Sequence, residues 1–201
     1  MAPSDDARID LRPLHMKRIF IALPITKEPE IDWPLKLREE KFIRWIKPKN
    51  LHITLVPPWY VADSRMEAQL DREPESLPLV AQRLKSLEGK LTSFEMRFDR
   101  VRFGPDPKKP RLIWAEGETP QQLWELKTEI EKRLEREPED RPFRLHVTLA
   151  RFRAEDFSHF PVKELDKEIE WSEQVKAFVL MESRLSPKGA EYKVLEKVRL
   201  R

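Results

Sequence analysis

Cysteine is absent from this 201-residue sequence. Its absence excludes disulfide bonds, thiolate metal sites and catalysis by a cysteine nucleophile. Long apolar runs are absent too, because no stretch approaches the roughly 20 residues that span a bilayer. Residues 1–15 contain no apolar segment of the kind found in a signal peptide. These absences predict a cytoplasmic protein with no membrane partner.

The sequence also lacks a large excess of either positive or negative charge. The sequence has 39 Lys and Arg residues against 36 Asp and Glu residues, which gives a net charge of +3. At this balance a nucleic-acid-binding protein must gather its positive side chains on one face. Six basic side chains crowd between residues 97 and 111, and they either neutralise RNA phosphates or form a solvated surface. They are Arg97, Arg100, Arg102, Lys108, Lys109 and Arg111.

The hydrophobic pattern predicts an α+β fold with antiparallel sheets, because strands and helices do not alternate regularly as in a doubly wound parallel sheet. Predicted strands cover residues 18–23, 51–56, 94–103, 112–115 and 145–152, and residues 174–183 and 190–200 form a hairpin. Predicted helices cover residues 35–46, 77–88 and 119–136. Residues 1–16 lack periodicity, so we expect a flexible leader before a single domain that covers residues 17–201.

Two local features of this pattern can be tested against a structure. The apolar alternation of residues 94–98 resumes out of phase at Val101 and Phe103, which predicts a β-bulge near Asp99 and Arg100. Thr119 precedes Pro120 and is the predicted N-cap of the last helix.

One pentapeptide recurs. Residues 51–55 have the sequence Leu-His-Ile-Thr-Leu, and residues 145–149 have the sequence Leu-His-Val-Thr-Leu, each on a predicted strand that follows a predicted helix. Side chains on a strand alternate between its two faces. Each copy therefore presents one His and one Thr to the same side and anchors its apolar face in the core. The repeat predicts two related lobes.

Two such strands facing a common cleft supply the groups that phosphodiester cleavage needs. Because histidine titrates near neutral pH, one of His52 and His146 can act as general base while the other donates a proton. The hydroxyls of Thr54 and Thr148 can donate hydrogen bonds to phosphoryl oxygens. A single His-x-Thr triplet is usually structural, but two copies in matching strands favour catalysis. A zinc site is less favoured, because no third ligand or HExxH motif accompanies the histidines.

The paired motifs His52-Ile53-Thr54-Leu55 and His146-Val147-Thr148-Leu149 resemble the signature of the two-histidine phosphoesterase superfamily. The layout from about residue 17 to the C-terminus is similar to the RNA 2′,3′-cyclic phosphodiesterase branch, also called the 2′-5′ RNA ligase family. The opening strand at residues 18–23 and the Leu149-Ala150-Arg151 segment add to the likeness. The resemblance implies two pseudo-symmetric lobes, each an antiparallel sheet with helices packed outside, around a central catalytic cleft.

The resemblance also implies a reaction. His146 is expected to activate water and His52 to protonate the departing 3′-oxygen, which leaves a 2′-phosphomonoester, while Thr54 and Thr148 hold the phosphate. No metal or other cofactor is implied, and reversible 2′-5′ RNA ligation is the family's second activity. The expected partner is an RNA 3′ end with a 2′,3′-cyclic phosphate, bound by a monomer that needs no obligate protein partner.

Two further residues are candidates for substrate binding. Phe20 can stack on a terminal base. Strict alternation puts Arg151 on the face opposite His146, so it reaches the phosphate only where the strand bulges or twists. The sequence departs from the family pattern at residues 56–59, Val-Pro-Pro-Trp, and at Leu145, where proline is common. Two alternatives stay open: a two-histidine esterase of a small cyclic nucleotide, and a catalytically silent RNA-binding module.

Overall fold

The computed structural model of the chain describes residues 16–31, 37, 39–63, 75–139, 142–186 and 189–201. The predicted leader lies outside the described residues, except that Met16 begins the first strand. In the described part of the chain, no helix has the length and apolar character needed to cross a membrane.

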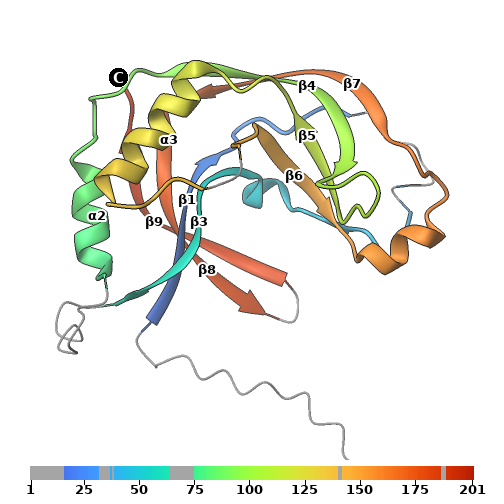
Figure 1. Ribbon diagram of the computed structural model, residues 1–201, viewed down its shortest axis with the longest axis horizontal. Helices are drawn as coiled ribbons and strands as arrows, with labels where there is room; N and C mark the ends of the chain where they lie inside the picture. Colours follow the sequence, from blue (N-terminus) through green and yellow to red (C-terminus); the bar gives the residue numbers. More distant parts are fainter. Residues whose placement is uncertain (1–15, 32–36, 38, 64–74, 140–141, 187–188) are drawn as a thin grey trace, which may run out of the picture.

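Two antiparallel sheets form the framework of the molecule (Figure 1). The first sheet has the strand order β3-β1-β8-β9, with β3 at His52–Ala62, β1 at Met16–Pro24, β8 at Ala177–Ser186 and β9 at Gly189–Arg199. The second sheet has the order β2-β6-β5-β4-β7, with β2 at Arg44–Trp45, β6 at His146–Arg151, β5 at Leu112–Glu116, β4 at Phe94–Gly104 and β7 at Asp166–Val175. The predicted α+β class with antiparallel sheets is confirmed.

The strand order of the two sheets has the pseudo-symmetry that the repeated pentapeptide predicts. β3 begins at His52 and pairs with β1, and β6 begins at His146 and pairs with β5. Beyond these pairs, β8 and β9 of the first sheet match β4 and β7 of the second. Each motif therefore lies on a corresponding strand of its own sheet.

Within the described residues, two α-helices pack their apolar stripes against the sheets. They are α2 at Leu77–Lys85, which contacts β9, and α3 at Gln121–Arg133, which contacts β3. The prediction that Thr119 is the N-cap of α3 is wrong, because Pro120 occupies the N-cap position. Pro120 makes no side-chain hydrogen bond to the helix. The Thr119 hydroxyl accepts the Leu145 N–H at 3.0 Å instead, and so fastens the start of β6.

The helix predicted over residues 35–46 is wrong in its second half. Residues 35, 36 and 38 lie outside the described residues, whereas Arg44–Trp45 form β2 and pair with Arg151 and Ala150 of β6. The unpaired edge of β6 offers backbone hydrogen bonds that outweigh a weak helical periodicity. Two 3-10 helices lie in the described chain, η1 at Pro48–Asn50 and η3 at Ala154–His159.

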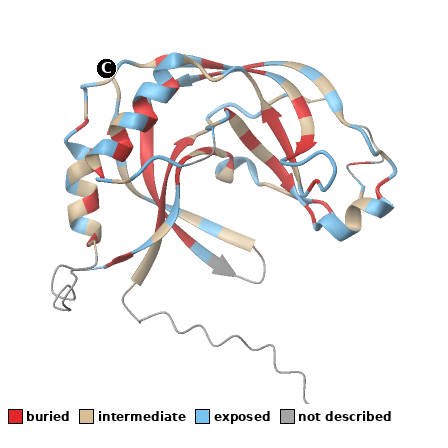
Figure 2. Ribbon diagram, in the orientation of Figure 1, coloured by how far each residue is buried: buried red, intermediate tan, exposed pale blue. Residues whose placement is uncertain are grey.

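The core runs along the strands and the inner sides of the helices (Figure 2). One large cluster of buried side chains includes members of both sheets and both α-helices. A smaller cluster of Phe20, Ala22, Val179 and Met181 belongs to the first sheet. The bulge predicted near residues 99–100 is confirmed, because the register of β4 against β7 shifts between Phe98 and Arg100.

Candidate active site

Each motif histidine is held by the backbone two residues before it. Nδ1 of His52 lies 2.7 Å from the Asn50 carbonyl oxygen, and Nδ1 of His146 lies 2.9 Å from the Arg144 carbonyl oxygen. A carbonyl oxygen can only accept, so each Nδ1 carries the hydrogen and donates it. The remaining nitrogen, Nε2, is then the atom of each imidazole that takes up or releases a proton.

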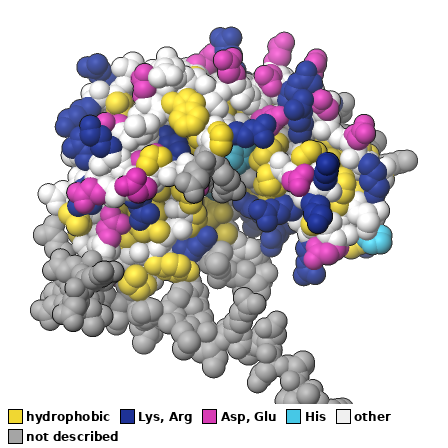
Figure 3. All heavy atoms as spheres, in the orientation of Figure 1, with side chains coloured by type: hydrophobic (Ala, Val, Ile, Leu, Met, Phe, Trp, Pro, Cys, Tyr) yellow, Lys and Arg dark blue, Asp and Glu magenta, His cyan; other side chains and the backbone are white. Residues whose placement is uncertain are grey.

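The two imidazoles lie near each other although they belong to different sheets. β3 contacts β6, and the charge of His146 lowers the pKa of His52. Figure 3 shows the surface hollowed between the two halves of the molecule, with histidine, Lys and Arg side chains at this recess. The structure thus brings together the two residues that the repeat singles out.

The motif threonines accompany the histidines. Thr54 and Thr148 are two residues from His52 and His146 on the same strands, and all four side chains are half-buried between core residues that point the other way. Neither threonine hydroxyl has a hydrogen-bond partner among the residues that the structure describes. Both hydroxyls are therefore available to a ligand at the histidines.

A matching β-bulge follows both motifs. In the first sheet, Thr54 pairs with Ala22 and Val56 with Ile21, which leaves Leu55 as an additional residue. In the second sheet, Thr148 pairs with Trp114 and Ala150 with Ile113, which leaves Leu149 as an additional residue. Each bulge reverses the alternation of the strand beyond it.

The bulge in β6 turns Arg151 to the side of the histidines. The residue is exposed, and its positive charge lowers the pKa of both His52 and His146. A charge that acts on both imidazoles lies close to both. The sequence allowed Arg151 to face the histidine side only if the strand bulges, and β6 does bulge before this residue. The corresponding residue of the first sheet is Pro57, which has no charge.

Burial is the main influence on the proton affinity of both histidines. Desolvation lowers the pKa of His52 and of His146 below the ordinary histidine value, because the charged imidazole loses water. The backbone bonds to Asn50 and Arg144 oppose this effect and raise the pKa of each ring. At His146 the carboxylate of Glu116 also raises the pKa.

Aromatic rings flank both histidines. The ring centroids of Phe20 and Tyr192 lie 5.2 Å and 5.1 Å from that of His52, and the Trp114 centroid lies 4.9 Å from that of His146. Phe20 was a sequence candidate, and it lies beside His52 with only 2% of its surface exposed. Sequence analysis missed Tyr192 and Trp114, because only strand pairing brings them to the motifs.

The basic cluster at residues 97–111 is partly neutralised. Arg97 pairs with Glu95, Arg100 pairs with Asp166 and Glu168, and Arg102 pairs with Asp166 and Glu116. Arg100 and Arg102 thus serve the second sheet through cross-strand ion pairs, and the Arg97–Glu95 pair lies within β4. They do not form a row of unpaired charges for RNA phosphates.

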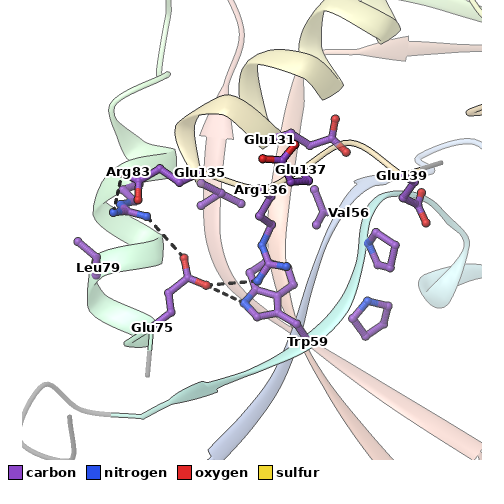
Figure 4. Close-up of a pocket in the computed structure, with 13 residues that line it drawn as sticks. Val56, Trp59, Glu75, Leu79, Arg83, Glu131, Glu135, Arg136, Glu137 and Glu139 are labelled. Carbon is purple, nitrogen blue, oxygen red and sulfur yellow. Dashed lines mark hydrogen bonds and ion pairs between the residues drawn. The ribbon is translucent and has the colours of Figure 1, made fainter. Parts of the chain in front are cut away.

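A pocket of ≈ 680 Å³ lies apart from the motif histidines, between α2, the end of α3 and β3 (Figure 4). Its centre is organised by Glu75, whose carboxylate accepts from Trp59 Nε1 at 3.0 Å and from Arg136 Nη2 at 3.3 Å. Further carboxylates line the wall, namely Glu131, Glu135, Glu137 and Glu139. Arg83 and Arg136 also line this pocket and pair with Glu75 and Glu135, but neither motif histidine lines it, so the histidine cleft is the candidate site.

A metal centre has no support at this cleft. In the described ranges, no group of three or more His, Asp or Glu side chains is arranged to hold a metal ion. The threonine hydroxyls and Arg151 near the histidines suit a phosphate anion, and the carboxylate near His146 is that of Glu116.

Comparisons with known proteins agree with this geometry. The family model described as the 2′-5′ RNA ligase superfamily matches residues 29–186. An RNA 2′,3′-cyclic phosphodiesterase of Thermus thermophilus is 33% identical over 195 residues, which cover 92% of this chain and 90% of that protein. A second RNA 2′,3′-cyclic phosphodiesterase, from Archaeoglobus fulgidus, is 27% identical over 156 residues, which cover 76% of this chain and 81% of that protein.

Solved structures share the fold. The protein TT0787 of Thermus thermophilus superposes with a TM-score of 0.64 at 24% identity, covering 92% of this chain and 98% of that chain. LigT of E. coli, solved in complex with 3′-AMP, superposes with a TM-score of 0.60 at 20% identity and the same coverage. At these identities the superpositions establish a common architecture of two sheets.

Proposed function

The chain belongs to the 2′-5′ RNA ligase superfamily, and from this premise we propose that it hydrolyses 2′,3′-cyclic phosphates at RNA 3′ ends. The two curated relatives are named for that activity. The proposed enzyme acts as a monomer in the cytoplasm, because one chain supplies both histidines and the sequence has no cysteine.

The proposed reaction is an acid–base hydrolysis. Nε2 of neutral His146 takes a proton from water as the water oxygen bonds to phosphorus. The bond between phosphorus and O3′ breaks, and Nε2 of protonated His52 gives its proton to O3′. The products are a 2′-phosphomonoester and a free 3′-hydroxyl, and proton exchange with solvent restores both imidazoles. Thr54, Thr148 and Arg151 bind the non-bridging oxygens, where negative charge develops.

The observation that carries the proposal is the matching of the two motif strands. Each presents a half-buried imidazole whose Nδ1 is occupied by a backbone carbonyl and whose Nε2 is left for proton transfer. Each adds a threonine two residues later. A binding module has no need of two titrating groups prepared in the same way, so hydrolysis is favoured over silent RNA binding.

The test is turnover of a short RNA that ends in a 2′,3′-cyclic phosphate, measured with EDTA present. We expect wild type to form the 2′-phosphate. His52→Ala and His146→Ala should each lose on the order of a hundred- to ten-thousandfold in kcat/KM, which is the usual contribution of a general acid or base. His159→Ala is the matched control, because that histidine ends η3 away from the motifs.

Circular dichroism of each variant separates loss of chemistry from loss of fold. Turnover of either folded motif variant at the wild-type rate would refute the paired mechanism. A wild type that cleaves 2′,3′-cyclic AMP but not the RNA end would point to the small-nucleotide esterase. Binding of the RNA without turnover of either substrate would point to the silent module.

A further inference from the structure

The two motif strands have corresponding neighbours in their sheets, so the residues opposite the two histidines can be compared directly. In the strand correspondence, β1 stands beside β3 as β5 stands beside β6. The residue directly opposite His52 is Pro24, and the residue directly opposite His146 is Glu116. Of the two motif histidines, His146 is thus the one with a carboxylate as its cross-strand neighbour.

Residues opposite each other in an antiparallel pair place their side chains on the same face, with Cβ atoms about 4.5–5.5 Å apart. Glu116 is therefore a neighbour of the His146 imidazole through the register of the sheet. The same row continues outward through Arg100 of β4 to Glu168 of β7. Charges of alternating sign follow one another from the histidine across the second sheet.

The Glu116 carboxylate is fixed in place. Its side chain is 15% exposed, and Oε1 accepts from Arg102 Nη1 at 3.1 Å. Arg144 Nη2 lies 3.9 Å from Oε2. Arg102 is itself anchored, because its Nε and Nη2 donate to the two carboxylate oxygens of Asp166 at 3.1 and 3.2 Å. The negative charge beside His146 is consequently held on β5.

The other charges that face His146 are positive. Arg144 precedes its strand, Arg151 ends it, and both lower the pKa of the imidazole. From β4, Arg100 and Arg102 face the same row, and carboxylates of β5 and β7 pair with them. From β3, the charged form of His52 is also close to His146, because the charge of His146 lowers the pKa of His52. Glu116 is the acidic group that opposes burial and these arginines.

We propose that Glu116 is a positioning residue that favours the protonated form of His146 and thereby makes the two motif histidines chemically unequal. The proposal rests on the proposed function. His146 beside Glu116 is the stronger base of the pair, so in the enzyme molecules in which it is neutral it takes the proton from water more readily. His52 lies opposite Pro24 and has no such carboxylate on its neighbouring strand, so once protonated it releases its proton to O3′ more readily.

The test is a pH titration of the histidine ring signals by NMR, in the whole protein without substrate. The sequence has four histidines, so substituting each in turn assigns its signal. In Glu116→Gln we expect the midpoint of the His146 titration to move to lower pH, and the His52 midpoint to move less. Glu116→Asp keeps the charge and should keep the His146 midpoint above that of Glu116→Gln.

Glu168→Gln is the matched control, because Glu168 lies in the same cross-strand row but two strands further out and is 82% exposed. It should leave both midpoints at their wild-type values. An unchanged His146 midpoint in Glu116→Gln, or an equal displacement in Glu168→Gln, would overturn the proposal. If Glu116→Gln unfolds, Arg102→Gln tests the same inference, because it releases the carboxylate from its anchor and should displace the His146 midpoint. Since the titration needs no turnover, its result is independent of whether the RNA end is the substrate.

Discussion

Arg151 and Pro57 occupy corresponding positions in β6 and β3, each the second residue after a bulge. Arg151 brings a guanidinium to both imidazoles, and Pro57 brings no charge. A single arginine has five donors in a planar fork that matches two phosphoryl oxygens. In the proposed reaction, one residue from one lobe thus supplies the positive charge for the phosphate.

Substituting Arg151 should alter both binding and pH dependence. In Arg151→Gln we expect kcat/KM to fall about tenfold to hundredfold, as loss of a charged hydrogen bond of about 1.5–3 kcal/mol implies. Because Arg151 lowers the pKa of His52 and of His146, its removal should raise both. Both limbs of the pH–rate profile, recorded from about pH 5 to about pH 9, should then move to higher pH.

Arg153→Gln is the control for this prediction. Arg153 is also exposed, but it lies beyond the end of β6. A profile that stays at the wild-type position in Arg151→Gln, or that moves equally in Arg153→Gln, would show that Arg151 does not act on the imidazoles.

At the scale of the element, each motif strand owes its shape to a group that binds the carbonyl of its bulged residue. The Leu149 carbonyl accepts the backbone N–H of Ile46 at 2.8 Å. The Leu55 carbonyl accepts from Lys127 Nζ of α3 at 3.1 Å. Lys127 is 4% exposed, pairs with the buried Glu131 one turn later, and lies 5.6 Å from the centroid of the Phe143 ring. The helix therefore binds the bulged residue of the first motif, as the residue after β2 binds that of the second.

Breaking this buried pair should be costly. Lys127→Met leaves Glu131 buried without a partner, so we expect the free energy of unfolding to fall by about 3–5 kcal/mol in urea denaturation. The double variant Lys127→Met, Glu131→Leu should recover most of this stability, because both charges are gone. Its turnover should stay below wild type, since the Leu55 carbonyl still lacks its donor.

Lys85→Met is the surface comparison, since the Lys85–Glu88 pair is exposed. It should leave the unfolding midpoint near the wild-type value. Equal stability of Lys127→Met and Lys85→Met, or full turnover in the double variant, would contradict the role assigned to Lys127.

How far the sequence predicts these elements depends on whether their signal is local. The out-of-phase alternation at Val101 predicted the bulge in β4 correctly, because a bulge changes the periodicity of its own strand. The bulges at Leu55 and Leu149 left no such mark, since consecutive apolar residues also fit a buried strand. The helix predicted at residues 35–46 failed where pairing with β6 made β2.

The same limit applies to the site. The histidines and threonines were found because they repeat, and their catalytic roles stay predictions. Glu116, Trp114 and Tyr192 could not be found, because nothing in one strand tells which residue of its neighbour will lie opposite. Glu116 follows an ordinary apolar strand segment and looks like a solvated strand end.

At the scale of the whole molecule, the net charge is small and three of the clustered arginines are paired with carboxylates. RNA should then be held by few phosphate contacts, with Arg151 foremost. For single strands, the logarithm of the affinity falls with the logarithm of salt concentration by about 0.7 per phosphate contact. For a fourfold increase in salt concentration, one phosphate contact corresponds to a roughly threefold loss of affinity, and six contacts correspond to a roughly 300-fold loss.

We therefore expect KM for a cyclic-phosphate RNA end to rise only about threefold between about 50 and about 200 mM KCl. The measurement is steady-state kinetics at each salt concentration, with kcat as the internal control. A rise above about a hundredfold would mean that the whole basic cluster at residues 97–111 contacts RNA.

The order in which the chain enters the two sheets has a consequence for synthesis on the ribosome. β1 and β3 are made early, but their sheet also contains β8 and β9, the last strands of the chain. Every strand of the second sheet precedes β8 in the chain, so this sheet can form while the first still lacks the β8–β9 hairpin. Tyr192, which abuts His52, is supplied by that hairpin. A nascent chain that does not yet contain β8 and β9 thus has a complete second motif and an unfinished first, so activity should begin only after this hairpin has been made.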